Sequence, residues 1–153
     1  MIWGAFGNGK LGRLYLVEKN QKMNAEMYRQ VLCKHLKASL KMTGCSVFMQ
    51  DGAPCHTART IKEWFADNNV EVLDFLDWSV QSCDLNPIEN LWTELNRIIA
   101  TMPIYSNLDQ LAKQIKKAWA KLGRDTRLLS ALADSMPRRV EAVIQANGDV
   151  TTY

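Results

Sequence analysis

The fold class is decided by residues 46–73, which read SVFMQDGAPCHTARTIKEWFADNNVEVL. The first five of these residues form a short apolar run between turn-forming residues, which predicts a buried strand over residues 46–50. A helix is expected next, with Thr57 as its N-cap and an end near residue 68. A second short strand is expected over residues 70–73. Strand, helix and strand in this order predict an α/β fold.

Toward the N-terminus, the sequence predicts a β-hairpin followed by a helix. Residues 1–6 and 11–18 are rich in β-formers, and the Gly-Asn-Gly between them is a strong turn signal. A helix is expected over residues 25–42, where apolar side chains recur at helical spacing, and Gly44 ends it. His35 lies within this apolar stripe, so a packed histidine is expected there rather than a metal ligand.

The C-terminal half is predicted to be helical. Asn86 is a good N-cap, with a proline at the first helical position, for a helix that ends near residue 101. A second helix is expected over residues 108–122 and a third helical region over residues 126–146, which Pro137 could break or restart. Nothing in the sequence resembles a flexible linker, so the whole chain is expected to form a single domain.

Composition and charge restrict the class of protein. Of the 153 residues, 47% are hydrophobic and 23% are charged, as in a globular domain. No apolar run reaches the roughly 18 residues of a membrane span and no secretory signal is visible, so we expect an intracellular chain without a membrane partner. Residues 51–89 carry eight acidic and two basic side chains, whereas residues 1–50 carry two and eight. This pattern suggests a cation-binding centre beside surfaces for a polyanion, or ordinary surface patchiness.

Asp51 and Glu89 are the candidate metal ligands. Asp51 follows a predicted strand, and ligands gather at the carboxyl ends of strands in α/β sheets. Glu89 is expected in the first turn of the helix after the next strand. Two carboxylates and a substrate phosphate are typical Mg²⁺ ligands. Each residue also has a structural explanation, because Asp51 could only form a turn and Glu89 could only bond back to the N-cap.

Two motifs carry a specific resemblance. VFMQDGAPCHTARTIKEWFADNNVEVLDF, followed by QSCDLNPIENLWTELNR, closely resembles the catalytic domain of mariner-type DDE transposases. The opening WGAFGNGKLGRLYLVEKNQKMNAEMYRQVLCKHL and the ending SMPRRVEAVIQANGDVTTY are also similar to that family. The resemblance covers almost the whole chain and implies a ribonuclease H-like mixed sheet with flanking helices.

The same resemblance implies a chemistry and its partners. It implies metal-dependent cleavage and transfer of DNA strands in transposition, with Mg²⁺ or Mn²⁺ held by an Asp-Asp-Glu triad. Asp51 matches the second Asp of that triad and Glu89 matches the Glu, with 37 residues between them. The implied partners are transposon-end DNA and a second copy of the chain in a homodimer. In a eukaryote, the implied location is the nucleus.

Two features depart from the family pattern. The family's first Asp lies on a strand before the W-G motif, whereas this sequence begins at that motif and has no aspartate in residues 1–50. The pairs Trp78-Ser79 and Ser82-Cys83 replace two proline-containing pairs of the family. We therefore expect the C-terminal part of a catalytic domain, without its central first strand and catalytically incomplete. The two strand edges left without a partner would close on each other or accept a strand from another chain.

Seven lysines are candidates for nucleic-acid binding. They lie on the outer faces of two predicted helices and are Lys34, Lys37, Lys41, Lys113, Lys116, Lys117 and Lys121. Phosphate contacts from these side chains would weaken steeply with salt, whereas simple solvated helix faces would bind nothing. Three hypotheses about function therefore stay open: a transposase-derived endonuclease domain, a non-catalytic nucleic-acid-binding module and an inactive transposon remnant. Whether the chain is itself an enzyme is left open as well.

Overall fold

The computed structural model describes residues 1–73, 85–149 and 151. The two residue pairs that replace the family's prolines lie outside these ranges. Among the described residues, no helix is long and apolar enough to cross a membrane.

An antiparallel hairpin opens the chain, formed by β1 (Ile2–Gly7) and β2 (Lys10–Leu16). Its two-residue turn places Asn8 at a φ of 48° and Gly9 at a φ of 69°. Asn-Gly turns favour this left-handed conformation because it matches the twist of the two strands. The predicted hairpin is therefore confirmed.

A long helix follows the hairpin. It consists of three consecutive segments: α1 (Ala25–Val31), a π-helical turn (Leu32–Leu36) and α2 (Lys37–Thr43). The Asn24 side chain caps its start by accepting a hydrogen bond of 2.9 Å from the Met27 N–H. Gly44, at a φ of 73°, ends it. The helix predicted here is confirmed, whereas the π-helical turn has no counterpart in the prediction.

The stretch that decides the fold class forms a strand-helix-strand unit. Its elements are β3 (Val47–Met49), α3 (Pro54–Thr57), α4 (Arg59–Asp67) and β4 (Glu71–Leu73). The two strands pair in parallel, with Phe48 opposite Val72. This arrangement confirms the predicted α/β class.

Two details of this unit differ from the prediction. The first helix starts at Pro54 rather than at Thr57, because proline fits the first helical turn. Ala58, with a ψ of 143°, then separates α3 from α4. The strand expected to be buried is covered on only one face: Phe48 packs against the core, whereas Val47 is 39% exposed.

Four helices complete the described chain. They are α5 (Ile88–Ala100), α6 (Leu108–Leu122), α7 (Thr126–Ala133) and α8 (Met136–Gln145). The N-cap of α5 is Pro87 rather than Asn86, so the helix begins one residue later than predicted; the Asn86 side chain still accepts a hydrogen bond of 3.2 Å from the Ile88 N–H. Pro137 lies in the first turn of α8, so the predicted third helical region is divided in two.

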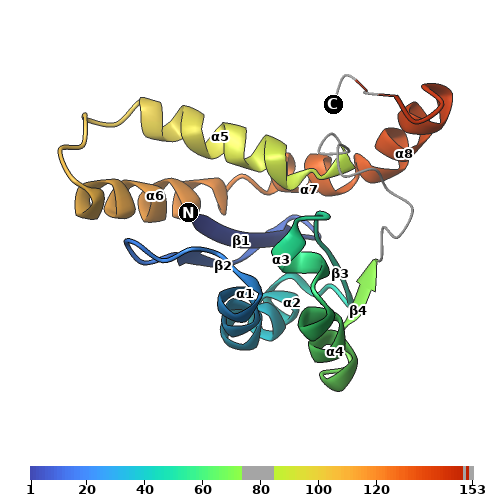
Figure 1. Ribbon diagram of the computed structural model, residues 1–153. Helices are drawn as coiled ribbons and strands as arrows, with labels where there is room; N and C mark the ends of the chain where they lie inside the picture. The colour runs from blue at the N-terminus through green and yellow to red at the C-terminus, as the bar shows by residue number, and fades with distance from the viewer. Residues whose placement is uncertain (74–84, 150, 152–153) are drawn as a thin grey trace.

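The hairpin lies between two hydrophobic layers. On one face, Trp3 packs against α1, the π-helical turn and α4. On the other face, Phe6 and Leu14 pack against α5, α6 and α7. The indole N–H of Trp119 in α6 donates to the Gly12 carbonyl at 3.3 Å and ties this helix to β2. Figure 1 shows α5 and α6 on one side of the hairpin and α1 and α2 on the other.

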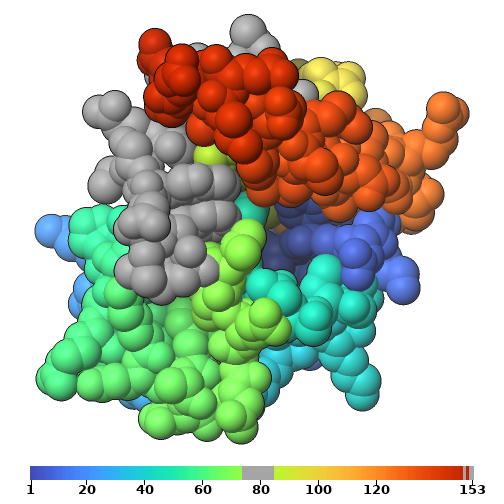
Figure 2. Space-filling view, turned by 90° about the vertical axis from the view of Figure 1, so that its right-hand side faces the viewer, coloured from blue at the N-terminus to red at the C-terminus, as the bar shows by residue number. Residues whose placement is uncertain are grey.

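The expected mixed sheet is present as two separate two-stranded sheets. Within the described residues, β1 pairs only with β2, and β3 pairs only with β4. A cavity of about 410 Å³ is lined by β1, by β3 and by the start of α5. The sheets are therefore not closed on each other by strand pairing. Figure 2 shows the hairpin in blue, between α7 and α8 in orange and red and the cyan and green segments below.

Candidate metal centre

Asp51 is the first candidate ligand, and the structure places it directly after β3. Its Oδ1 accepts a hydrogen bond of 3.0 Å from the Ala53 N–H and lies 2.5 Å from Nδ1 of His56. The bond to Ala53 is the turn contact that sequence reasoning offered as an alternative to metal binding. The side chain is 52% exposed, and its Oδ2 has no hydrogen-bond partner among the described residues. Oδ1 is thus held by the protein, whereas Oδ2 is available to a ligand.

The electrostatics of Asp51 favour its ionised form. The hydrogen bond from His56 lowers the pKa of this carboxyl group below its ordinary value, against an opposing effect of desolvation. The Ala53 N–H and the charge of His56 lower the pKa further. A carboxylate that stays charged at neutral pH is a suitable oxygen ligand for a hard divalent cation.

Glu89, the second candidate ligand, lies in the first turn of α5. Its backbone N–H donates to the Asn86 carbonyl at 3.1 Å. Its side chain has no hydrogen bond or ion pair with any described residue, so the proposed bond back to the N-cap is not formed. Desolvation raises the pKa of Glu89, and the negative charge of Asp51 raises it further.

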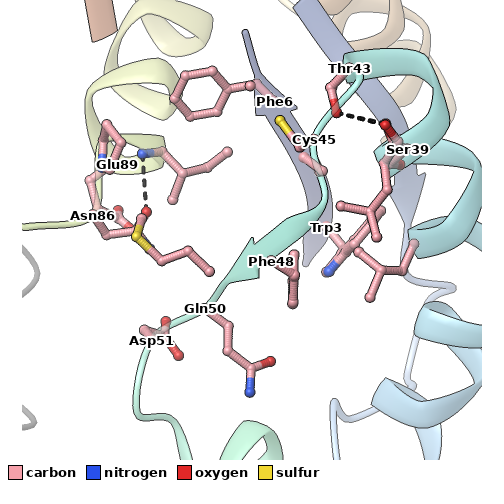
Figure 3. Close-up of a pocket in the computed structure, with 18 of the residues that line it drawn as sticks. Trp3, Phe6, Ser39, Thr43, Cys45, Phe48, Gln50, Asp51, Asn86 and Glu89 are labelled. Atoms are coloured by element: carbon pink, nitrogen blue, oxygen red, sulfur yellow. Dashed lines mark hydrogen bonds between the residues drawn. The ribbon is translucent and has the colours of Figure 1, made fainter. Parts of the chain in front are cut away.

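Asp51 and Glu89 line the same cavity. In Figure 3, Asp51 lies at the end of β3, and Glu89 and Asn86 lie at the start of α5. A cation between like charges would relieve their repulsion, so the donor chemistry of the pair fits a divalent metal. The described residues contain no cluster of three or more metal-ligating side chains, so the carboxylates remain a pair.

Three further polar residues belong to this site. His56 contacts Asp51 from within α3. Gln50 and Tyr28 were not among the candidate site residues predicted from the sequence. The Tyr28 hydroxyl donates to the Gln50 side chain at 2.6 Å, a pairing across 22 residues that no local pattern indicates.

The seven candidate nucleic-acid-binding lysines are all exposed, and none lines the cavity. Lys34 lies in the π-helical turn and Lys37 and Lys41 lie in α2, on one side of the hairpin. The other four lie in α6, on the opposite side, as the helices are arranged in Figure 1. The structure therefore divides these lysines into two separate surfaces, and their role stays a prediction.

His35 is a packed aromatic residue, as predicted, and Trp92 is packed as well. The ring of His35 stacks on Tyr15 at 5.0 Å between centroids and also contacts Trp3. Desolvation lowers the pKa of His35, which favours the neutral ring. The ring of Trp92 stacks on Trp119 at 5.7 Å. These contacts account for both residues without a metal.

Comparison with known proteins shows which family the chain belongs to. The sequence profile described as "DDE superfamily endonuclease" matches residues 3–112. The chain belongs to this family.

Curated transposases are similar in sequence to this chain. It is 37% identical over 155 aligned residues to the Tc1 transposase of Caenorhabditis elegans and 35% identical to the Tcb2 transposase of Caenorhabditis briggsae. Each alignment covers the whole of this chain and 54% of the relative. The chain thus spans about half the length of these relatives.

Solved structures confirm the ribonuclease H-like fold class. The catalytic domain of Mos1 mariner transposase superposes with a TM-score of 0.82 at 21% identity, over 98% of this chain and 74% of that domain. The Mos1 paired-end complex with the left transposon end superposes with a TM-score of 0.80 at 20% identity, over 97% of this chain and 43% of that chain.

Proposed function

We propose that this chain supplies two metal ligands, Asp51 and Glu89, to a transposase site that cleaves and transfers DNA strands. The carrying observation is that both carboxylates line one cavity and that the charge of Asp51 raises the pKa of Glu89. Mos1 catalytic-domain structures have been solved with Mg and with Mn, which supports either ion as the cofactor here. Such an ion, when bound, activates water and stabilises the leaving oxygen in phosphodiester cleavage.

The residues of this chain would prepare the site in distinct ways. Asp51 is kept ionised by its hydrogen bonds and presents one oxygen to the cavity. Glu89 lines the same cavity from the first turn of α5, with its side chain unengaged by other described residues. Apolar side chains, including Trp3 and Phe6, line the remainder of the cavity, whereas both carboxylates are exposed to solvent.

The wider context is proposed from the relatives. Transposon-end DNA is the proposed partner because the structurally similar Mos1 transposase has been solved as a paired-end complex with a transposon end. Pairing of two copies is proposed on the same basis. Because the curated relatives come from nematodes, the proposed place of action is the nucleus.

We expect the chain to be catalytically incomplete by itself, since a pair of carboxylates holds metal more weakly than a triad. Nicking of supercoiled plasmid DNA in Mn²⁺ tests this expectation, with Asp51→Asn as the variant and Asp67→Asn, an exposed change at the end of α4, as the matched control. The expected result is no nicking above the level of Asp51→Asn. Nicking that both the wild type and Asp67→Asn show, and that Asp51→Asn abolishes, would contradict incompleteness.

A second candidate function, non-catalytic binding of nucleic acid, is favoured by the four exposed lysines of α6. Replacing all four by Ala should weaken binding to any DNA duplex and reduce the slope of log affinity against log salt by about 0.9 for each lost phosphate contact. Replacing the three lysines on the other side of the hairpin is the matched comparison. Binding that is independent of salt would contradict this function.

A further inference from the structure

Asp51 is held by groups that themselves form a closed set of contacts. The Tyr28 hydroxyl donates to Gln50 Oε1 at 2.6 Å, and Gln50 Nε2 donates to the His56 carbonyl at 3.2 Å. The ring of His56 in turn packs on the ring of Tyr28, with 4.1 Å between centroids. We call Tyr28, Gln50 and His56 the Asp51 brace.

The brace joins three elements around one carboxylate. Tyr28, which is only 1% exposed, fixes it to the core through α1. Gln50 immediately precedes Asp51 at the end of β3, and His56 lies in α3. His56 is therefore restrained both through its backbone carbonyl and through its ring, and a restrained ring can fix the orientation of the group that it contacts.

The contact with Asp51 also determines which nitrogen of His56 carries a proton. An ionised carboxylate only accepts hydrogen bonds, so Nδ1, at 2.5 Å from Oδ1, must be the donor. Whenever the ring is neutral, its single N–H proton is therefore on Nδ1 and Nε2 is unprotonated. Because Oδ1 also accepts from the Ala53 N–H, both donors act on the same oxygen and leave Oδ2 directed to other partners.

We propose that His56 is a positioning residue that, through its Nδ1–H, holds Oδ1 of Asp51 so that Oδ2 is presented to a divalent cation. This proposal rests on the proposed function of Asp51 as a metal ligand. Tyr28 and Gln50 act through His56 by fixing its ring and its backbone. Groups that orient a ligating side chain commonly change metal affinity by about 10–100-fold when they are removed.

Two substitutions at His56 separate this role from direct metal ligation. The amide of Asn places a donor near the position of Nδ1, whereas the amide of Gln places one near the position of Nε2. Mn²⁺ affinity of the chain is measured by titration calorimetry for wild type, His56→Asn and His56→Gln, with thermal unfolding as a check on folding. We expect His56→Asn to bind within about threefold of wild type and His56→Gln to bind about tenfold more weakly.

The other outcomes overturn the proposal. If His56→Gln retains affinity and His56→Asn loses it, His56 acts through Nε2 rather than as a positioning residue. If both variants match wild type, or both lose affinity equally, the hydrogen bond donated by Nδ1 does not determine the Mn²⁺ affinity. Tyr28→Phe keeps the ring but removes the hydrogen bond to Gln50. We expect it to lose less Mn²⁺ affinity than His56→Gln does. A larger loss would contradict the assignment of Tyr28 as a residue that acts through His56.

A measurement without metal distinguishes failure of this inference from failure of the proposed function. Nitrogen-15 NMR of the metal-free chain should show His56 protonated at Nδ1 in wild type, and this preference should weaken in Asp51→Ala. Protonation at Nε2 instead would contradict the proposed hydrogen bond from His56 Nδ1–H to Asp51, whether or not the chain binds Mn²⁺. Absence of Mn²⁺ binding with the Nδ1 proton in place would refute the metal function and, with it, the positioning role, while leaving the His56–Asp51 contact established.

Discussion

Asp51 and Glu89 line one cavity although 37 residues separate them in the sequence, and the charge of Asp51 raises the pKa of Glu89. Helix α5 brings Glu89 into place from one side of the hairpin, and β3 brings Asp51 from the other sheet. The repulsion between them is a cost to the folded protein that a bound cation would relieve, which is the arrangement expected of a metal centre.

The two carboxylates should affect stability with opposite signs. Folding lowers the pKa of Asp51, so its stabilisation is present above its unfolded pKa and is lost as the pH falls through its folded pKa. Folding raises the pKa of Glu89, so its ionisation destabilises the protein at neutral pH and ceases to do so in acid. In thermal unfolding at pH 7.5, Asp51→Asn should lower Tm and Glu89→Gln should raise it slightly.

Both differences in Tm should shrink in acid: that of Glu89→Gln as the pH falls through the raised pKa of Glu89, and that of Asp51→Asn only as the pH falls on through the lowered pKa of Asp51. A drop in Tm at pH 7.5 for both variants would show that Glu89 makes a stabilising contact in solution and would contradict its assignment as an unengaged ligand.

Gly4 in β1 is predicted to be intolerant of any side chain. A Cβ at this position would lie 2.8 Å from Cη2 of both Trp92 and Trp119, which belong to the packed layer above the hairpin. Gly4→Ala should therefore lower the free energy of unfolding by about 1–3 kcal/mol, the usual effect of overpacking. Urea unfolding measures the change. Gly52→Ala is the matched control because a Cβ there meets no atom within 4 Å, and an equal loss in both variants would contradict the assigned packing.

The contact between α5 and α8 depends on a buried guanidinium group. Arg139 is 2% exposed, and its Nη2 donates to Asn90 Oδ1 at 2.6 Å. Asn90→Ala removes this acceptor from a buried charged donor and should lower the free energy of unfolding by about 1–3 kcal/mol. The comparison is Asn96→Ala, an exposed position in the same helix. Chemical denaturation that finds both variants alike would show that the Arg139 contact contributes little.

Local patterns predicted the elements of this fold well, but not the contacts around the site. The Asn-Gly turn and the helical stripe after residue 24 depend on neighbouring residues, and the structure confirmed both. The start of α3 at Pro54 was missed because both Pro54 and Thr57 are good starting residues, and local sequence does not decide between them.

In the candidate site, too, contacts between residues far apart in the sequence could not be predicted. Asp51 and Glu89 could be proposed from the resemblance, and the structure brings them to one cavity. The brace could not be predicted, because the contact of Tyr28 with Gln50 depends on how α1 packs beside β3. The exposure of Val47 was missed for a similar reason, since an apolar run does not reveal whether one or both faces of a strand are covered.

The central claim, that Asp51 and Glu89 together hold a divalent cation, is tested most directly by Mn²⁺ titration of the chain at pH 8, followed by electron paramagnetic resonance of free Mn²⁺. Wild type and the control Asp67→Asn should bind one equivalent with the same affinity, whereas Asp51→Asn and Glu89→Gln should each bind at least about tenfold more weakly. Equal Mn²⁺ binding by all four proteins, or no binding by wild type, would contradict the claim.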